Sequence, residues 1–348
     1  MSKLITFCVP SYNSEAYMHK CIDSLLKGNH DDIEIIIVND GSKDNTGAIA
    51  DKYHEQYPDV VKVVHQENGG HGSGVLAGIR EGTGLYYKVV DSDDWANEEA
   101  LLKLLDTIRT HIKEDKSPDC YFVNYVFENV ILNETYTAKV TKFFPVGKLF
   151  TWKDVKRFGV ADYIMMHSVI FKMSVLKECN LIIPRHTFYV DNIYVFRPFR
   201  CVKTMYYLDV DFYRYFIGRQ DQSVNFDIMV KRYDHQLRVI ENMATAYTLK
   251  EMRSLEKKQY RFLLHDLIVK NFLTLAFVYG KYTKEKGKEY KQYFKNFKAF
   301  DKKLYRKIRF RSTFLVPFLL IRPLRIAAVR FGYKQICKKT KWGEYNEV

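Results

Sequence analysis

The stretch Lys88-Val89-Val90-Asp91-Ser92-Asp93-Asp94-Trp95 decides the predicted fold of this 348-residue chain. Its first half continues an apolar run from Leu85 that is typical of a buried β-strand, and its second half places three carboxylates where that strand ends. Ligands of α/β proteins bind at the carboxyl ends of parallel strands. Carboxylates this close repel one another unless a cation lies between them, and hard oxygen ligands favour Mg²⁺ or Mn²⁺. The stretch therefore predicts a metal-assisted site for a diphosphate.

A simpler interpretation of the same acidic residues is that they precede a helix. Asn97 would be the N-cap of that helix, and Glu98 and Glu99 would lie in its first turn, where negative charge is favourable. Because Asn97 already provides the cap, the helix does not need the preceding acids, and we favour the metal site.

Apolar segments alternate with helical segments over the first 126 residues, which predicts βαβ units and a parallel sheet. The expected strands are Leu4–Val9, Ile33–Val38, Val60–His65, Leu85–Val90 and Cys120–Val126. The expected helices are Glu15–Lys27, Asn45–Tyr57, Ser73–Glu81 and Glu98–Ile112. Two of the strands are nearly continuous in β-branched residues, as in strands that are covered on both faces.

The rest of the chain reads as mixed structure followed by helices. Short strands are expected at Ser168–Phe171, Thr204–Leu208 and Tyr213–Phe216. Beyond these, helices are expected near Ile228–Leu249, Leu255–Tyr279, Lys284–Phe297 and Phe310–Cys337. The overall prediction is an α/β fold with a helical C-terminal extension.

The cysteines and the distribution of charge indicate the cellular compartment and the kind of partner. The six cysteines show neither C-x-x-C spacing nor a pairing pattern, which indicates a reducing compartment and argues against a cysteine-based zinc site. Lys3 leads directly into a strand without a signal-peptide pattern, so a cytoplasmic location is expected. Residues 250–348 hold 26 Lys and Arg against 8 Asp and Glu, a net charge of +18. Since the whole chain carries +14, the first 249 residues carry −4.

This basic tail contains Phe310–Ile326, which is apolar and aromatic but too short to span a bilayer and interrupted by Arg322. Such a segment among many Lys and Arg suits a helix lying on an anionic membrane. The alternative is an ordinary amphipathic helix packed on the body of the protein. We favour the membrane surface, because the basic excess surrounds the segment.

Two more strand ends carry candidate binding residues. The first strand ends in Pro10-Ser11-Tyr12-Asn13 and the second in Asn39-Asp40-Gly41-Ser42, so both lie beside the Asp91 edge of the predicted sheet. A planar base could rest against Tyr12, while the Asp40 carboxylate accepts hydrogen bonds from an N–H edge such as that of uracil. Turn chemistry is the alternative, because Asp-Gly-Ser is a good turn.

Together with Asn68-Gly69-Gly70, these motifs resemble family 2 glycosyltransferases of the GT-A fold, a Rossmann-like mixed sheet that handles nucleotide-diphospho-sugars. The resemblance covers about the first 125 residues. It implies a catalytic domain over residues 1–225, with a nucleotide-sugar-binding half at 1–126 and an acceptor half at 127–225, followed by a basic helical region at 226–348. It also implies site residues and a Mn²⁺ or Mg²⁺ cofactor. The implied donor-binding residues are Pro10, Tyr12, Asp40, Asp91, Ser92, Arg219 and Ser223, and the implied metal ligands are Asp93 and Asp91.

Downstream, the resemblance implies a catalytic base at Asp191, in Phe188-Tyr189-Val190-Asp191-Asn192. The family often shows Glu-Asp where this chain has Val190-Asp191. A carboxylate here would take the proton of an acceptor hydroxyl as it attacks the anomeric carbon; the alternative is a residue favoured by a helix N-terminus. Arg219 and Ser223 resemble a loop that closes over the diphosphate, with a plain polar loop as the alternative.

Rival interpretations come from other features. Gly72-Ser73-Gly74-Val75-Leu76-Ala77 fits the G-x-G-x-x-A pattern of an NAD-dependent oxidoreductase, with Asp91 about twenty residues on. That pattern normally opens the first βαβ unit, and its acid normally stands alone. A non-catalytic membrane-docking module is the third reading. His71, His167 and His186 are weaker candidates for contacts to the donor, the acceptor or a metal.

We therefore predict an inverting, metal-dependent glycosyltransferase that moves a hexose from a UDP-sugar to a glycan or lipid-linked acceptor. The resemblance implies a role in bacterial capsule or cell-wall polysaccharide synthesis. The expected location is cytoplasmic, at the inner face of the cell membrane, with an anionic membrane surface and no nucleic acid as partner. The sequence does not decide the sugar, the acceptor hydroxyl or whether the tail forms a homo-oligomer.

Overall fold

A computed structural model gives the structure of the protein over residues 3–129, 133–159, 162–217, 226–280 and 283–314. Contacts between residues divide it into two compact units. The first comprises Met1–Lys156 and Ile164–Ile217, and the second comprises Arg157–Tyr163 and Gly218–Val348.

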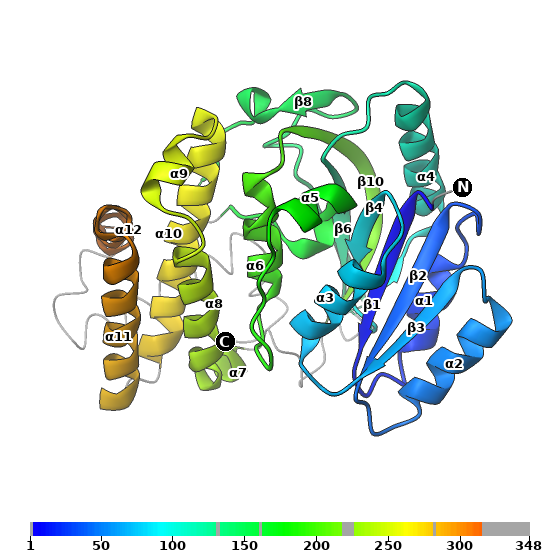
Figure 1. The fold of residues 1–348 in the computed structure, drawn as a ribbon, viewed down its shortest axis with the longest axis horizontal. Helices are drawn as coiled ribbons and strands as arrows, with labels where there is room; N and C mark the ends of the chain where they lie inside the picture. The colour runs from blue at the N-terminus through cyan, green and yellow to red at the C-terminus, as the bar shows by residue number, and fades with distance from the viewer. Residues whose placement is uncertain (1–2, 130–132, 160–161, 218–225, 281–282, 315–348) are drawn as a thin grey trace. The chain divides into compact units, whose positions relative to one another are not determined.

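The first unit is built on one mixed β-sheet with the strand order β3-β2-β1-β4-β9-β6-β10-β5 (Figure 1). The strands are β1 (Ile5–Ser11), β2 (Ile33–Asp40), β3 (Val61–Gln66), β4 (Tyr86–Val89), β5 (Trp95–Ala96), β6 (Cys120–Asn129), β7 (Glu134–Ala138), β8 (Leu149–Thr151), β9 (Val169–Lys172) and β10 (Thr204–Ile217). Strands β3, β2, β1 and β4 are parallel, whereas β9 runs antiparallel to both of its neighbours. The predicted α/β fold with a parallel N-terminal half is confirmed.

Helices cover both faces of this sheet. They are α1 (Met18–Leu25), α2 (Thr46–Gln56), α3 (His71–Glu81), α4 (Glu98–Lys113), α5 (Met173–Glu178) and α6 (Asp191–Phe196). Alternate residues of β1, such as Phe7 and Val9, pack into a core with α1 and α4. Cys8 points to the other face, where its thiol donates to the Gly74 carbonyl of α3 at 3.6 Å. Both faces of β1 are therefore buried, as its apolar sequence predicts.

One expected pair of strands is a single strand. The segments Thr204–Leu208 and Tyr213–Phe216 are both part of β10, whose register against β6 shifts on either side of Asp211. Acidic residues are rare in strands, so Asp209 and Asp211 suggested a break. In the structure the Asn124 side chain of β6 donates to Asp209 at 2.7 Å and to Asp211 at 2.9 Å, which accommodates them in a bulged strand.

The second unit is helical, as predicted for the C-terminal extension. Its helices are α7 (Phe226–Lys231), α8 (Tyr233–Ala244), α9 (Leu249–Arg253), α10 (Lys257–Gly280), α11 (Lys284–Phe300) and α12 (Lys302–Phe314). The expected helix Ile228–Leu249 is divided at Arg232 into α7 and α8 and ends at Ala244, and a capping box of Thr248 and Glu251 starts α9. No described helix is long and apolar enough to cross a membrane. Of the expected helix Phe310–Cys337, residues 315–337 lie outside the described residues.

The contact between α3 and the sheet depends on Gly78. A Cβ atom at this position would lie 2.3 Å from the Cys8 sulfur and 2.5 Å from the Tyr87 hydroxyl. We expect Gly78→Ala to lower the free energy of unfolding by about 1–3 kcal/mol, because the two layers must separate. Urea unfolding followed by circular dichroism measures this. The control Arg80→Ala, on the exposed side of the same helix, should stay within about 0.5 kcal/mol; wild-type stability for Gly78→Ala would contradict the packing.

Candidate functional site

Three parallel strands bring polar residues to one edge of the sheet. Strands β2, β1 and β4 are neighbours, and their carboxyl ends lead to Asp40, Tyr12 and Asp91 respectively. Pro10 is buried within β1, whereas the Tyr12 side chain is 49% exposed and available for stacking. Adjacent parallel strands end at a common edge, so the structure gathers these predicted residues in one place.

Asp40 shapes the loop that follows β3. Its carboxylate is buried and accepts hydrogen bonds from the backbone N–H groups of Gly69 (2.9 Å) and Gly70 (2.8 Å) and from the Gln66 side chain (2.6 Å). A carboxylate offers about four acceptor positions. One position is therefore left for a ligand N–H, and the other three fix the loop.

Ser92 ties the acidic turn after β4 to the loop after β1. Its hydroxyl lies 2.7 Å from that of Ser14, and both side chains are buried. Asn97, not the acidic turn, caps α4, because its side chain accepts the Ala100 N–H at 2.9 Å. The carboxylates of the turn are thus not needed to start the helix.

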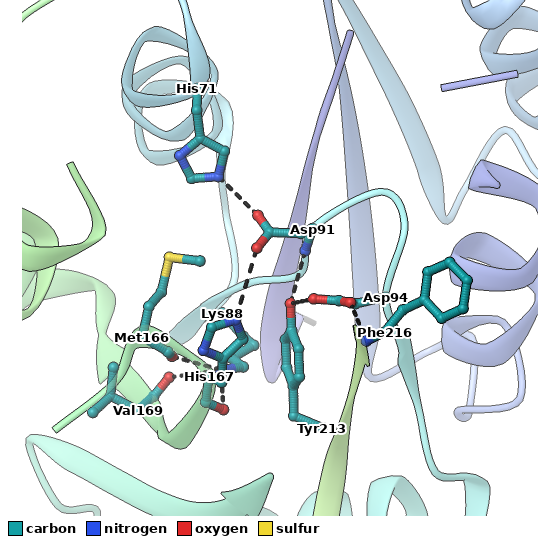
Figure 2. A network of polar contacts seen from close by, with 9 residues as sticks. All are labelled: His71, Lys88, Asp91, Asp94, Met166, His167, Val169, Tyr213 and Phe216. Carbon is teal, nitrogen blue, oxygen red and sulfur yellow. Dashed lines mark hydrogen bonds and ion pairs between the residues drawn. The ribbon is translucent and has the colours of Figure 1, made fainter. Parts of the chain in front are cut away.

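Asp94 is the buried member of the acidic turn. Its carboxylate accepts hydrogen bonds from the Tyr213 hydroxyl (2.6 Å) and the Phe216 N–H (2.8 Å), both on β10 (Figure 2). The same hydroxyl accepts the Asp91 N–H at 3.1 Å. Burial first, and then the charges of Asp93 and Asp91, raise the pKa of Asp94 well above its usual value. The turn therefore holds more negative charge than its surroundings neutralise.

Two histidines approach Asp91 from different sides (Figure 2). His71 Nε2 lies 2.8 Å from one carboxylate oxygen, and His167 Nε2 lies 3.9 Å from the other. Although burial opposes ionisation, the charge and hydrogen bond of His71 lower the pKa of Asp91. Burial lowers the pKa of His167 to about 3, so its ring is neutral. Asp91 therefore carries a full negative charge beside the histidines.

His167 is the more unusual of the pair. It is 5% exposed, and within the described part of the chain neither ring nitrogen has a hydrogen-bond partner. The ring stacks on Tyr215 with centroids 4.3 Å apart and meets Tyr213 edge-on at 4.7 Å. A buried, unpaired imidazole beside a carboxylate is suited to receive a ligand atom.

Lys88 fixes the turn that carries His167. Its side chain is fully buried, and the ammonium donates to the carbonyls of Met166 (2.9 Å), His167 (2.7 Å) and Val169 (3.2 Å). Burial lowers the pKa of Lys88 to about 7. The sequence contained a hint of this role, since a lysine interrupts the apolar strand that ends in the acidic turn, but the carbonyl partners lie about eighty residues away.

Asp191 begins α6 and reaches the same region. The preceding segment is docked on the loop after β3, because the His186 N–H donates to the Gly69 carbonyl at 2.7 Å. The charge of Asp191, together with those of Asp91 and Asp93, raises the pKa of His71 against the effect of burial. The predicted base and the acidic turn therefore share one electrostatic environment.

The remaining candidates from the sequence include Arg219, Ser223 and His71. Arg219 and Ser223 lie outside the described residues. His71, expected in a loop, is the first residue of α3. Asp94, Lys88 and Tyr213 were not predicted as site residues, and only the acidic turn itself pointed to Asp94.

The side chains around the acidic turn form a set of metal ligands that suits a divalent cation. Among the described residues, Asp91, Asp94 and His167 offer ligand atoms that all lie within 4.8 Å of one another. The expected pair was Asp91 and Asp93; Asp93 is half-buried in the same turn, and its charge raises the pKa of Asp94. Crowded carboxylate oxygens with unneutralised charge fit Mn²⁺ or Mg²⁺.

The glycines after β3 do not form a dinucleotide site. A Cβ atom on Gly72 would lie 2.2 Å from the Ile183 side chain, and one on Gly74 would lie 3.0 Å from Pro10. Both glycines thus allow close packing within the protein. The helix they open also follows the third strand and not the first, so the oxidoreductase interpretation is not supported.

Comparison with known proteins identifies the fold and the family. Residues 6–174 match the profile of "Glycosyl transferase family 2". The crystal structure of Staphylococcus aureus TarS 1–349 in complex with UDP-GlcNAc is similar to this chain, with a TM-score of 0.65, 17% identity and coverage of 95% of this chain and 91% of that one. The first unit thus has the GT-A fold. Residues 6–174, just under half of the chain, therefore match glycosyltransferase family 2.

Curated relatives match over shorter regions. The uncharacterized glycosyltransferase EpsJ of Bacillus subtilis is 41% identical over 106 residues, which is 30% of either chain. The glycosyltransferase GlyG of Streptococcus pneumoniae is 40% identical over 126 residues, 36% of this chain and 40% of GlyG. The similarity therefore spans less than half the length of these relatives.

Lys88→Met tests whether the buried amino group supports the site. The substitution leaves three carbonyls without the group that donates to them, so we expect a loss of about 1–3 kcal/mol in the free energy of unfolding at pH 8. Chemical unfolding measures it, with the exposed Lys103→Met as control. An unchanged stability would show that the contacts of the amino group are not needed.

The lowered pKa of Lys88 predicts that the free energy of unfolding depends on pH. The folded protein releases the Lys88 proton near pH 7, whereas the unfolded chain keeps it up to its ordinary pKa of 10.5. Between these values the unfolded state binds more protons, so wild-type stability should rise with pH relative to Lys88→Met. Unfolding at a series of pH values from 7 to 10 measures the difference, and a flat or falling difference contradicts a neutral buried lysine.

Proposed function

We propose that the protein is an inverting glycosyltransferase that transfers a hexose from a UDP-sugar to a glycan or lipid-linked acceptor. The observation that carries this proposal is the convergence of Asp191 with Asp91 and Asp93 around His71. Metal-dependent inverting transfer can use this combination, with one carboxylate taking a proton from the acceptor and others holding the metal that supports the leaving diphosphate.

The donor would bind along the edge formed by β2, β1 and β4. Asp40 has one acceptor position left for the uracil N–H, and the exposed Tyr12 ring beside buried Pro10 would lie against the base. Asp91 and Ser92 would contact the ribose and the diphosphate side. The UDP-GlcNAc complex of TarS, which has the same fold, supports UDP as the nucleotide.

Asp93 and Asp91 would hold Mn²⁺ or Mg²⁺, with His167 and Asp94 close by. When bound, such an ion neutralises the charge that develops on the departing diphosphate. The chain's own contribution is to position Asp91 through His71, Asp94 through Tyr213 and the turn that carries His167 through Lys88. Arg219 and Ser223 are proposed to close over the phosphates.

Asp191 would act as the general base. It begins α6, is half-buried, and belongs to the electrostatic environment of the acidic turn. From there its carboxylate would accept the proton of the acceptor hydroxyl as the oxygen attacks the anomeric carbon opposite the leaving group, which gives inversion. The setting proposed for this reaction is capsule or cell-wall polysaccharide synthesis at the cytoplasmic face of the membrane.

The variant Asp191→Asn tests the role of the general base independently of donor binding. We expect the rate of transfer from the UDP-sugar to fall by about 10²–10⁴-fold, because the amide cannot take the proton. UDP binding should remain, since the donor residues are untouched. Single-turnover kinetics and calorimetry with UDP measure the two effects.

The control for this variant is Asp59→Asn, which removes an exposed carboxylate just before β3, at the end of that strand opposite to the one beside Asp40. It should leave both the rate and UDP binding unchanged. Near-normal transfer by Asp191→Asn would remove Asp191 from the reaction.

A further inference from the structure

Helix α11 presents a continuous row of lysines. They are Lys284, Lys288, Lys291, Lys295 and Lys298, and all five are exposed. Their spacing of four, three, four and three residues keeps them on one side of a helix with 3.6 residues per turn. We call these five residues the lysine stripe.

The acidic residues of α11 lie outside the lysine stripe. Glu289 lines a groove between α8 and α11 that also contains Asp234 and Glu241. Within this groove the Asn296 side chain donates to Glu241 at 2.7 Å. The buried side of α11 is formed by Gly287, Tyr290, Tyr293 and Phe297. Glu289 therefore belongs to the groove, and Glu285, next to Lys284, is the acidic residue of α11 beside the lysine stripe.

Helix α12 extends the positive charge. Lys302, Arg306 and Arg309 are exposed at spacings of four and three, and Lys302–Phe314 contains no acidic residue. The Arg309 guanidinium lies over the Phe294 ring of α11 at 5.9 Å, so the basic side of α12 adjoins α11. The lysine stripe together with Lys302, Arg306 and Arg309 is called the basic surface.

Large aromatic side chains accompany these charges. Phe310 on α12 is 70% exposed, and Phe300 at the end of α11 is 41% exposed. A soluble polyanion would be matched by charge alone, whereas exposed aromatic rings among Lys and Arg are suited to the boundary between lipid headgroups and acyl chains. The combination favours a lipid surface.

We propose that the basic surface binds an anionic phospholipid bilayer, with Phe300 and Phe310 entering the headgroup region. Each Lys or Arg near such a surface adds to the attraction, and the sum falls as salt rises. This inference rests on the proposed function only in that a lipid-linked acceptor would be met at this surface. It assigns the membrane contact to α11 and α12, where the side chains are described.

Co-sedimentation of the full chain with lipid vesicles tests the proposal. Vesicles of phosphatidylcholine with about 30% phosphatidylglycerol should bind the protein, and vesicles of phosphatidylcholine alone should not. Changing all five stripe lysines to Gln should weaken partitioning by roughly a hundredfold. The matched control changes five exposed lysines of the first unit to Gln and should stay within about threefold. These control residues are Lys27, Lys52, Lys103, Lys113 and Lys177.

Two results would overturn the proposal. One is equal binding by the stripe variant and the control variant. The other is binding to inorganic polyphosphate without binding to vesicles, which would indicate a soluble polyanion as the partner. Phe310→Ser should also weaken binding to anionic vesicles, because it removes the exposed ring without changing charge.

A measurement of UDP binding distinguishes a failure of the membrane proposal from a failure of the proposed function. The stripe variant should retain stabilisation by UDP, because no stripe lysine is a proposed donor residue and Tyr12, Asp40 and Asp91 lie in the first unit. Loss of vesicle binding with UDP binding intact concerns the membrane contact alone. Vesicle binding without any transfer activity would leave this inference standing and remove the proposed reaction.

Discussion

The burial of the Asp91 and Asp94 carboxylates at the end of β4 is the constraint on which the rest of the site depends. Burying an ionised carboxylate is costly unless hydrogen bonds and opposite charge compensate it. The compensation comes from distant segments, since His71 opens α3, Tyr213 belongs to β10 and Lys88 holds the turn that carries His167. The acidic turn therefore fixes the positions of these elements as much as they fix the turn.

The compensation is incomplete, and that incompleteness connects the structure to function. Asp94 has a raised pKa because Asp93 and Asp91 lie beside it, and His167 remains neutral and unpaired within the described residues. A bound cation would stabilise such an arrangement further. In the proposed function the substrate would bring its own negative charge to that cation, as a nucleoside diphosphate does.

Much of the first unit could be predicted from local sequence. Apolar runs alternating with helical segments gave β1 to β4 in the correct order, and the residues after each strand pointed to one edge of the sheet. The roles of Lys88 and Tyr213 could not be predicted, because Lys88 donates to carbonyls 78 to 81 residues away and Tyr213 bonds Asp94 and Asp91, 119 and 122 residues away. The role of His167 likewise depends on Asp91, in a distant segment. The two expected strands are continuous in β10 because the Asn124 side chain donates hydrogen bonds to Asp209 and Asp211. Strand propensity alone disfavours these two aspartates.

The central claim is that the acidic turn binds a nucleoside diphosphate through a divalent metal. Thermal unfolding of the purified chain with UDP, in the presence and absence of Mn²⁺, tests it most directly, with Asp93→Asn as the matched variant. At a hundred times its dissociation constant a ligand adds about 2.7 kcal/mol of stability. The account predicts that UDP stabilises the wild-type protein only with Mn²⁺ and that Asp93→Asn abolishes the effect. Stabilisation by UDP that is the same without Mn²⁺, or in Asp93→Asn, would contradict it.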